Sequence, residues 1–177
     1  EQKGAFPLKA MEKSIIEPDP LKVNLLINPE FVLKNGQISK WRGNAYGGGQ
    51  KKAMVKAAKT DDGGPCAIFY NDKASCIHVF QYMKISNSSG KCHVRFRYKA
   101  AANTGIRVKL SLSQNINGNA VEYECTTKES QILKADGSWQ TFRADFKIKP
   151  DITGNIVLHI KAMCQEISLA DAVVREE

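Results

Sequence analysis

The stretch IRVKLSL, residues 106–112, alternates apolar and polar side chains without a break. Successive side chains of a β-strand point to opposite faces, so this period of two predicts a strand that is buried on one face and exposed on the other. The same alternation recurs in HVRFRYK (93–99), TFRADFKIK (141–149) and IVLHIKA (156–162). The apolar positions expected to face a core are Val94, Phe96, Tyr98, Ile106, Val108, Leu110, Leu112, Phe142, Ala144, Phe146, Ile148, Ile156, Leu158 and Ile160.

Short polar segments separate these apolar runs. Examples are TDDGGP (60–65), SNSSGK (86–91), AANTG (101–105) and KADGS (134–138). Gly, Asn, Asp and Ser favour turns because they tolerate unusual backbone angles or hydrogen-bond their own backbone. Only KKAMVKAAK (51–59) shows any trace of a helical period. About eight strands with connectors this short predict an all-β protein, an antiparallel β-sandwich.

The first 22 residues differ from the rest of the chain. They contain Pro7, Pro18 and Pro20 and show little periodicity. Because proline fixes φ and lacks an N–H group, the EPDP segment cannot lie inside a helix and favours an extended backbone. We expect residues 1–22 to be an extended leader or linker. Residues 23–177 are expected to form one β-sandwich module, since a chain of 177 residues suits a single domain.

No apolar run approaches the ~18 residues that a membrane-spanning helix needs, so no membrane span is expected. The opening EQKGAFPLKAMEKS lacks the apolar core of a secretory signal. This indicates either a cytosolic protein or a mature chain whose signal has been removed.

The chain carries a net charge of +8 at pH 7. Lys and Arg are spread along it instead of forming one block, which is typical of a solvated surface. An acidic partner such as a polyanionic glycan would also fit this charge. No RNA-recognition or oligonucleotide-binding signature is present, so nucleic acid is not an expected partner.

The five cysteines, at positions 66, 76, 92, 125 and 164, form no CxxC pair and leave two interpretations open. Cys66 and Cys76 flank AIFYNDKAS, which has the pattern of a hairpin, and a disulfide could join them across its two strands. Alternatively, all five are buried, reduced cysteines that act as small apolar side chains.

The order of several landmarks is more specific than the strand pattern. The apolar part of the chain opens with NLLINPEF (24–31), continues to Trp41, and later carries GSWQTF (137–142) and EISLADAVV (166–174). Across residues 23–176 this order resembles the CenC-like carbohydrate-binding modules of families 4 and 9. The resemblance implies a galactose-binding-like jelly roll that is secreted, periplasmic or at the cell surface. It also implies a module that works alone or within a larger glycan-processing assembly.

The function implied by the resemblance is non-catalytic binding of a poly- or oligosaccharide, by a sheet face or by a loop edge. Aromatic rings would contact the CH face of a sugar, and charged or amide groups would bind its hydroxyls. Strand parity and loop position give these candidates: Tyr46, Tyr70, His78, Tyr82, His93, Arg95, Arg97 and Arg107. If the strands at 93–99 and 106–112 are neighbours, one sheet presents a basic surface suited to a uronate- or sulfate-bearing glycan.

Three large aromatic residues are expected to mark the fold. Phe31 follows NPE at the end of the first apolar run, where a large ring would close one end of the core. Trp41 and Trp139 coincide with landmark positions of the family. The favoured interpretation packs both tryptophans inside the sandwich, and the alternative stacks them on a sugar.

The resemblance further implies a structural calcium ion between the first and last strands. A hard cation of this kind needs several oxygen ligands. Asp171 falls on the first acid of the family's closing motif, and we expect it to bind the ion together with Glu30 and nearby carbonyl groups. Val32 stands where the opening carboxylate is expected, and Ala172 replaces the second closing acid. The match is therefore incomplete, and no other cofactor is expected.

An enzyme is the less favoured class. A glycosidase needs two carboxyl groups about 5–9.5 Å apart across the scissile bond. Glu122 and Glu124 lie two residues apart in VEYEC and would share one face of a strand, so they are the one candidate pair. The three histidines lie on separate predicted strands, and no HExxH or GxSxG signature is present. We therefore expect no catalysis. A polysaccharide-degrading enzyme stays an alternative, as does a protein-interaction or adhesion module without a glycan ligand.

Overall fold

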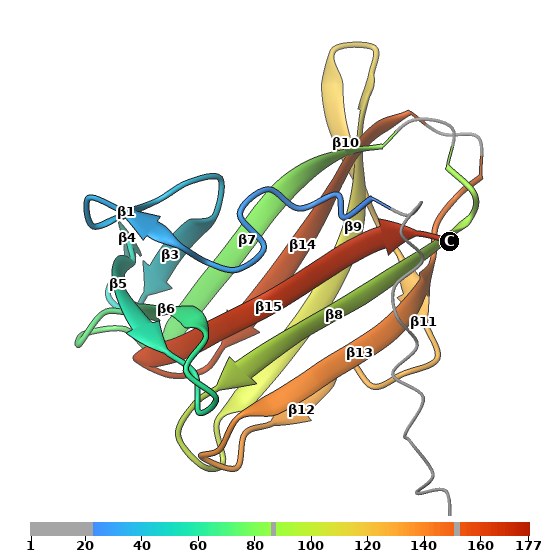
Figure 1. Ribbon diagram of the computed structural model, residues 1–177. Helices are drawn as coiled ribbons and strands as arrows, with labels where there is room; N and C mark the ends of the chain where they lie inside the picture. Colours follow the sequence, from blue (N-terminus) through green and yellow to red (C-terminus); the bar gives the residue numbers. More distant parts are fainter. Residues whose placement is uncertain (1–22, 86–87, 151–152) are drawn as a thin grey trace, which may run out of the picture.

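The computed structural model describes residues 23–85, 88–150 and 153–177. The leader or linker expected for residues 1–22 lies outside these residues. Within the described part of the chain two β-sheets face each other and no helix forms, so none of its segments is a helix that could cross a membrane (Figure 1). Figure 1 shows β15, β8 and β13 as the front layer and β7, β14 and β9 as the layer behind them. The predicted antiparallel β-sandwich is confirmed.

The larger sheet has seven strands. Their spatial order is β10 (Asn119–Glu124), β9 (Gly105–Ile116), β14 (Gly154–Ala162), β7 (Cys76–Ile85), β3 (Arg42–Tyr46) and β4 (Gln50–Lys52), and β12 (Ile132–Lys134) also pairs with β9. The second sheet has six strands in the order β11 (Thr126–Thr127), β13 (Gln140–Lys147), β8 (Lys91–Lys99), β15 (Glu166–Glu176), β6 (Pro65–Tyr70) and β5 (Met54–Lys59). A short ribbon of β1 (Leu33–Lys34) and β2 (Gln37–Ile38) completes the described strands. The helical trace over residues 51–59 was misleading, because this segment lies in β4 and β5.

The core lies between the two sheets and is built from the predicted inward positions. Every apolar residue expected to face the core in the four alternating runs is at most 6% exposed. The alternation therefore identified the buried face of β8, β9, β13 and β14 correctly. The strands keep this parity because a shift by one residue would move the whole apolar set into water.

Phe31 and Trp41 close one end of this core, as predicted. Phe31 is fully buried, Trp41 is 3% exposed, and their rings stack with centroids 4.4 Å apart. Phe69 meets Phe31 edge-on at 6.4 Å, and the indole Nε1 of Trp41 donates a hydrogen bond to the carbonyl of Asn28 at 2.8 Å. Gly43 lets Phe69 approach, because a Cβ at that position would lie 2.9 Å from the phenylalanine ring.

Consecutive strands often change sheet, and this overturns the proposed disulfide. β6 lies in the six-stranded sheet and β7 in the seven-stranded sheet, so the segment between them is no hairpin. Cys66 pairs with Ala58 of β5, whereas Cys76 pairs with Tyr46 of β3. All five cysteines are free thiols, so the prediction of a bond between Cys66 and Cys76 is wrong.

Candidate functional site

The outer face of the seven-stranded sheet carries a row of rings. On β7, Ile77, Val79 and Gln81 point into the core, so His78, Phe80 and Tyr82 point outward. Strand pairing places His159 of β14 opposite Phe80 and Tyr46 of β3 opposite Cys76, on the same outer side. We call this set the aromatic face, and its members are Tyr46, His78, Phe80, Tyr82 and His159.

The rings of the aromatic face contact one another. The ring of His78 lies 4.8 Å from that of Phe80 and 5.1 Å from that of His159, measured between centroids. Phe80 and Tyr82 meet edge-to-face at 5.9 Å, and Tyr46 lies 6.4 Å from His78. Tyr82 is 53% exposed at one end of the row. The row thus runs from Tyr46 at the end of β3 to the exposed Tyr82, and three of its rings lie on β7.

Short side chains lie at the bottom of this face. Val157 pairs with Tyr82, and Ser111 pairs with Val157, so all three share the outer side of the sheet. Yet Val157 is only 2% exposed and Ser111 is fully buried. Longer neighbouring side chains therefore rise above them, and the face is uneven.

A chain of hydrogen bonds links the two histidines to an acid. His78 Nε2 lies 2.9 Å from His159 Nδ1, and His159 Nε2 lies 3.1 Å from Glu122 Oε1. An ionised carboxylate only accepts, so His159 donates from Nε2 and its Nδ1 accepts the Nε2 proton of His78. Both imidazoles are neutral in this arrangement. Burial, followed by the nearby positive charges, lowers the pKa of His78 to about 4.

Cations surround the rings. Arg42 places its guanidinium 5.9 Å from the centre of the Tyr82 ring. Lys109 Nζ lies 4.0 Å from Glu122, and Arg107 lies 3.7 Å from Glu124. The face therefore combines rings, imidazoles, carboxylates and flexible cations within a few strands.

The candidates predicted from the sequence divide between the two sheets. Tyr46, His78, Tyr82 and Arg107 lie on the outer side of the seven-stranded sheet. The other four, Tyr70, His93, Arg95 and Arg97, lie on the six-stranded sheet. The expected single basic surface is wrong, because β8 and β9 follow one another in the chain but belong to opposite sheets.

Arg97 of β8 is the centre of a charge cluster. It contacts Asp61 at 2.5 Å and both Asp62 and Asp171 at 3.3 Å, and these carboxylates raise its pKa further above its ordinary value. Its guanidinium also lies 5.2 Å from the centre of the Trp139 ring. Trp139 is only half-buried there, so the expectation that it packs inside the core is wrong.

The predicted calcium ligands do not fit the ion as they stand. The carboxylate of Asp171 already pairs with the guanidinium of Arg97, and Glu30 is exposed. Asn24, which precedes the first strand, joins the start of the described chain to β15 instead: it donates to the carbonyl of Ala172 and accepts from the N–H of Val174, both at 3.0 Å. Calcium binding stays an untested prediction.

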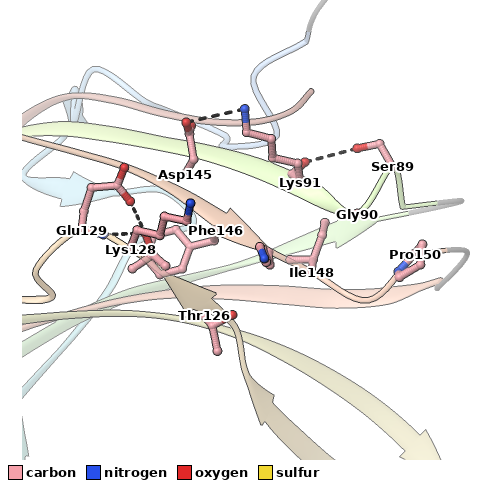
Figure 2. A pocket seen from close by; sticks show the side chains of 12 residues that line it. Ser89, Gly90, Lys91, Thr126, Lys128, Glu129, Asp145, Phe146, Ile148 and Pro150 are labelled. Atoms are coloured by element: carbon pink, nitrogen blue, oxygen red, sulfur yellow. Dashed lines mark hydrogen bonds and ion pairs between the residues drawn. The ribbon is translucent and has the colours of Figure 1, made fainter.

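A large cavity lies elsewhere in the described residues, at the edge of the six-stranded sheet. It measures about 680 Å³, and Figure 2 shows Thr126, Lys128, Glu129, Asp145 and Phe146 around it. Phe146 is its only aromatic neighbour and is fully buried, so the cavity presents no ring to a ligand. For this reason we place the candidate site on the aromatic face, which presents partly exposed rings.

Sequence reasoning missed Phe80, His159 and Arg42. Phe80 stands between two inward residues in an apolar run, and only its parity with His78 and Tyr82 could have placed it outside. His159 was assigned to a separate strand, which is correct, but the order of the strands brings it beside His78.

No protein-family model matches the chain, and no curated protein matches it. Among solved structures, TmCBM61 in complex with β-1,4-galactotriose has a TM-score of 0.57 at 20% identity, covering 88% of this chain and 99% of that one. The C-terminal family 22 carbohydrate-binding module of Clostridium thermocellum Xyn10B has a TM-score of 0.54 at 13% identity, covering 80% and 89%.

The enzymatically active domain of bacteriophage CBA120 tailspike protein 4 has a TM-score of 0.60 at 13% identity. It covers 87% of this chain, which spans only 21% of the tailspike chain. At these identities the likenesses establish the fold alone. They confirm the galactose-binding-like jelly roll predicted from the resemblance to the family 4 and 9 modules.

Proposed function

We propose that this protein is a non-catalytic carbohydrate-binding module that holds a poly- or oligosaccharide on its aromatic face. The observation that carries the proposal is the row of contacting rings on β7, which ends at the half-exposed Tyr82. An aromatic ring covers the apolar CH face of a sugar, and neighbouring polar groups bind its hydroxyls. Arg42 lies over the Tyr82 ring and Glu122 contacts His159, so both can supply such groups.

The solved structures support carbohydrate binding through the ligand or the binding role described for each. TmCBM61 was crystallised with a galactotriose, and the family 22 module was studied for residues of its cleft in ligand binding. Both share the sandwich of this chain. A face site is favoured over a loop edge here, because the rings follow one strand.

The surroundings of the two acids favour binding over catalysis. A glycosidase needs one carboxyl group that holds its proton and a second that is ionised. Glu122 instead accepts from His159 and lies near Lys109, and Glu124 pairs with Arg107. Despite its partial burial, the hydrogen bond from His159 and the nearby Lys109 keep the pKa of Glu122 below its ordinary value, so Glu122 is not the proton-holding group that a glycosidase requires. Incubation with a panel of polysaccharides should release no reducing ends, and product formation would replace this proposal with an enzyme.

The proposal includes two statements that extend beyond the fold. We propose that the protein is secreted, periplasmic or at the cell surface, where polysaccharides occur. We also propose that it serves within a larger glycan-processing assembly. Fractionation of the source cells and co-purification test these two statements separately from the binding site.

The decisive experiment compares binding to a glycan array and to affinity gels for the wild type, Tyr82→Ala and Phe80→Ala. Each variant should weaken binding roughly ten-fold, because a central aromatic contact typically contributes more than 1 kcal/mol. Tyr123→Ala is the matched control: Tyr123 is 48% exposed, and its pairing with the inward Leu112 places it on the opposite parity of the sheet. Equal binding by all four proteins would refute the site.

If the wild type binds no glycan at all, the function itself is refuted. A protein-interaction or adhesion module would then be the better interpretation. The same gels should include Arg95→Ala, which lies on the six-stranded sheet and should bind like the wild type.

A further inference from the structure

A small basic cavity lies beside the rings of the aromatic face. It measures about 70 Å³ and is lined by Arg107 and Lys109 of β9 and by His159 and Lys161 of β14. This volume is small compared with the other cavities of the described residues, and it suits a small group such as a carboxylate or sulfate. The ring of His159, which lines the cavity, lies 6.1 Å from the ring of Phe80, measured between centroids. A group bound in the cavity would therefore lie beside a sugar stacked on Phe80.

The cavity brings like charges together. Lys161 pairs directly with Arg107 across the two strands, and His159 pairs with Lys109 in the next row. Like charges at directly opposed positions destabilise a sheet. Nothing in core packing requires two cations here, since both side chains point away from the core. A bound anion would offset this repulsion.

The acids near the cavity compensate only part of its charge. Glu124 contacts Arg107 at 3.7 Å, and Glu122 lies 4.0 Å from Lys109. Lys161 has no ion-pair partner among the described residues and is exposed. The positive potential also reaches the imidazoles, because the charges of Lys161 and Lys109 contribute, after burial, to the lowered pKa of His78.

We propose that this cavity is an anion subsite, which binds a carboxylate or sulfate group of an acidic glycan whose sugar ring lies on the aromatic face. The inference rests on the proposed function and specifies its ligand class. Lys161 and Arg107 contribute the charge, and His159 donates no proton to the anion because its Nε2 proton already bonds to Glu122. The subsite therefore recognises the anion by its charge and small size.

The first test uses small anions at pH 7 and constant ionic strength. Sodium sulfate and sodium acetate replace sodium chloride stepwise, while NMR follows the imidazole signals of His159 and, as an internal reference, of His93 on the other sheet. At least one anion should shift the His159 signals saturably and leave those of His93 unchanged. The two salts distinguish a sulfate site from a carboxylate site.

The variants then locate the effect. Lys161→Gln should weaken the saturable shift roughly ten-fold, as expected for loss of one charge-assisted contact. Lys99→Gln changes the net charge equally on the six-stranded sheet and should leave the shift as in the wild type. No saturable shift, or the same weakening in both variants, would overturn the subsite.

A second test separates this proposal from the function on which it rests. Polygalacturonate and its methyl ester share one sugar chain with and without charge, as do dextran sulfate and dextran. Binding of neutral glycans that is lost in Tyr82→Ala but unaffected by Lys161→Gln would preserve the function and remove the subsite. A response of His159 to sulfate without binding of any glycan would preserve the subsite and remove the function.

Discussion

Replacing His78 by glutamine should make the protein more resistant to acid. The wild-type imidazole is 9% exposed and its pKa is lowered to about 4, whereas in the unfolded chain it has its ordinary value of 6.5. Between about pH 4 and pH 6.5 this histidine is therefore protonated in the unfolded state and neutral in the folded state. Stability contributed by the neutral imidazole is complete above about pH 6.5 and is lost as the pH falls toward 4.

The size of the loss follows from the shift. Each pKa unit corresponds to about 1.4 kcal/mol, so the wild type should lose about 3 kcal/mol from this group between pH 7.5 and pH 4. With a typical urea dependence of about 2 kcal/mol/M, the midpoint of unfolding should move by about 1.5 M. The pKa of His159 is lowered by burial in the same direction, against the opposing effect of Glu122.

Urea unfolding at both pH values, followed by tryptophan fluorescence, measures this loss. His78→Gln keeps a donor that can reach His159 Nδ1 but cannot titrate, so its midpoint should fall with pH by about 1.5 M less than that of the wild type. Other titrating groups act in both proteins and cancel in the comparison. His93→Gln is the control, because it removes an imidazole from the other sheet, where the ring lies 2.8 Å from Asp145 and has no histidine partner among the described residues. A variant as acid-sensitive as the wild type would refute the buried pair.

Three further predictions concern the fold. Gln81→Leu removes both hydrogen bonds to the backbone of Ile27, at 2.8 and 3.0 Å. Urea unfolding should show a free energy of unfolding lower by about 2–4 kcal/mol, and a loss below about 1 kcal/mol would contradict the role of this amide. Burial raises the pKa of Cys92 to about 12 and that of Cys125 to about 11, so iodoacetamide at pH 8 should leave both thiols unmodified in the native protein. After unfolding without reductant, mass spectrometry should find five adducts per chain. Only three adducts would show that two of the cysteines form a disulfide. Because an arginine already pairs with Asp171, millimolar calcium should leave the thermal midpoint unchanged, and a rise that EDTA reverses would establish the ion.

Strand parity is the part of this fold that a sequence expresses directly. In IRVKLSL the side-chain period follows from backbone geometry alone, and the buried positions of β8, β9, β13 and β14 were all predicted correctly. Which of the two sheets a strand joins cannot be predicted in the same way, because it depends on pairing with strands far away in the sequence. β8 and β9 are separated by a short turn, yet they pair with β13 and β15 on one side and with β14, β10 and β12 on the other.

The errors in the site have the same origin. Arg97 and Arg107 have the same charge, and each occupies a polar position in an alternating run. The neighbouring sequence therefore does not distinguish their surroundings. One lies among three aspartates on the six-stranded sheet, and the other lies by the aromatic face. The pairing of His78 with His159 likewise requires that β14 lies beside β7, which only the whole sandwich determines.

Core packing accounts for Phe31 and Trp41, but it does not account for the rings of the aromatic face. Phe31 and Trp41 are buried against each other, so any jelly roll closed at this end benefits from them whatever it binds. On the outer side of β7 core packing imposes nothing, and a row of three rings there exposes apolar area without filling the core. Across the same sheet, Arg107 faces Lys161 at a cost to stability. These two features share one face and neither is explained by folding, and they are the basis on which we propose a site there for an acidic glycan.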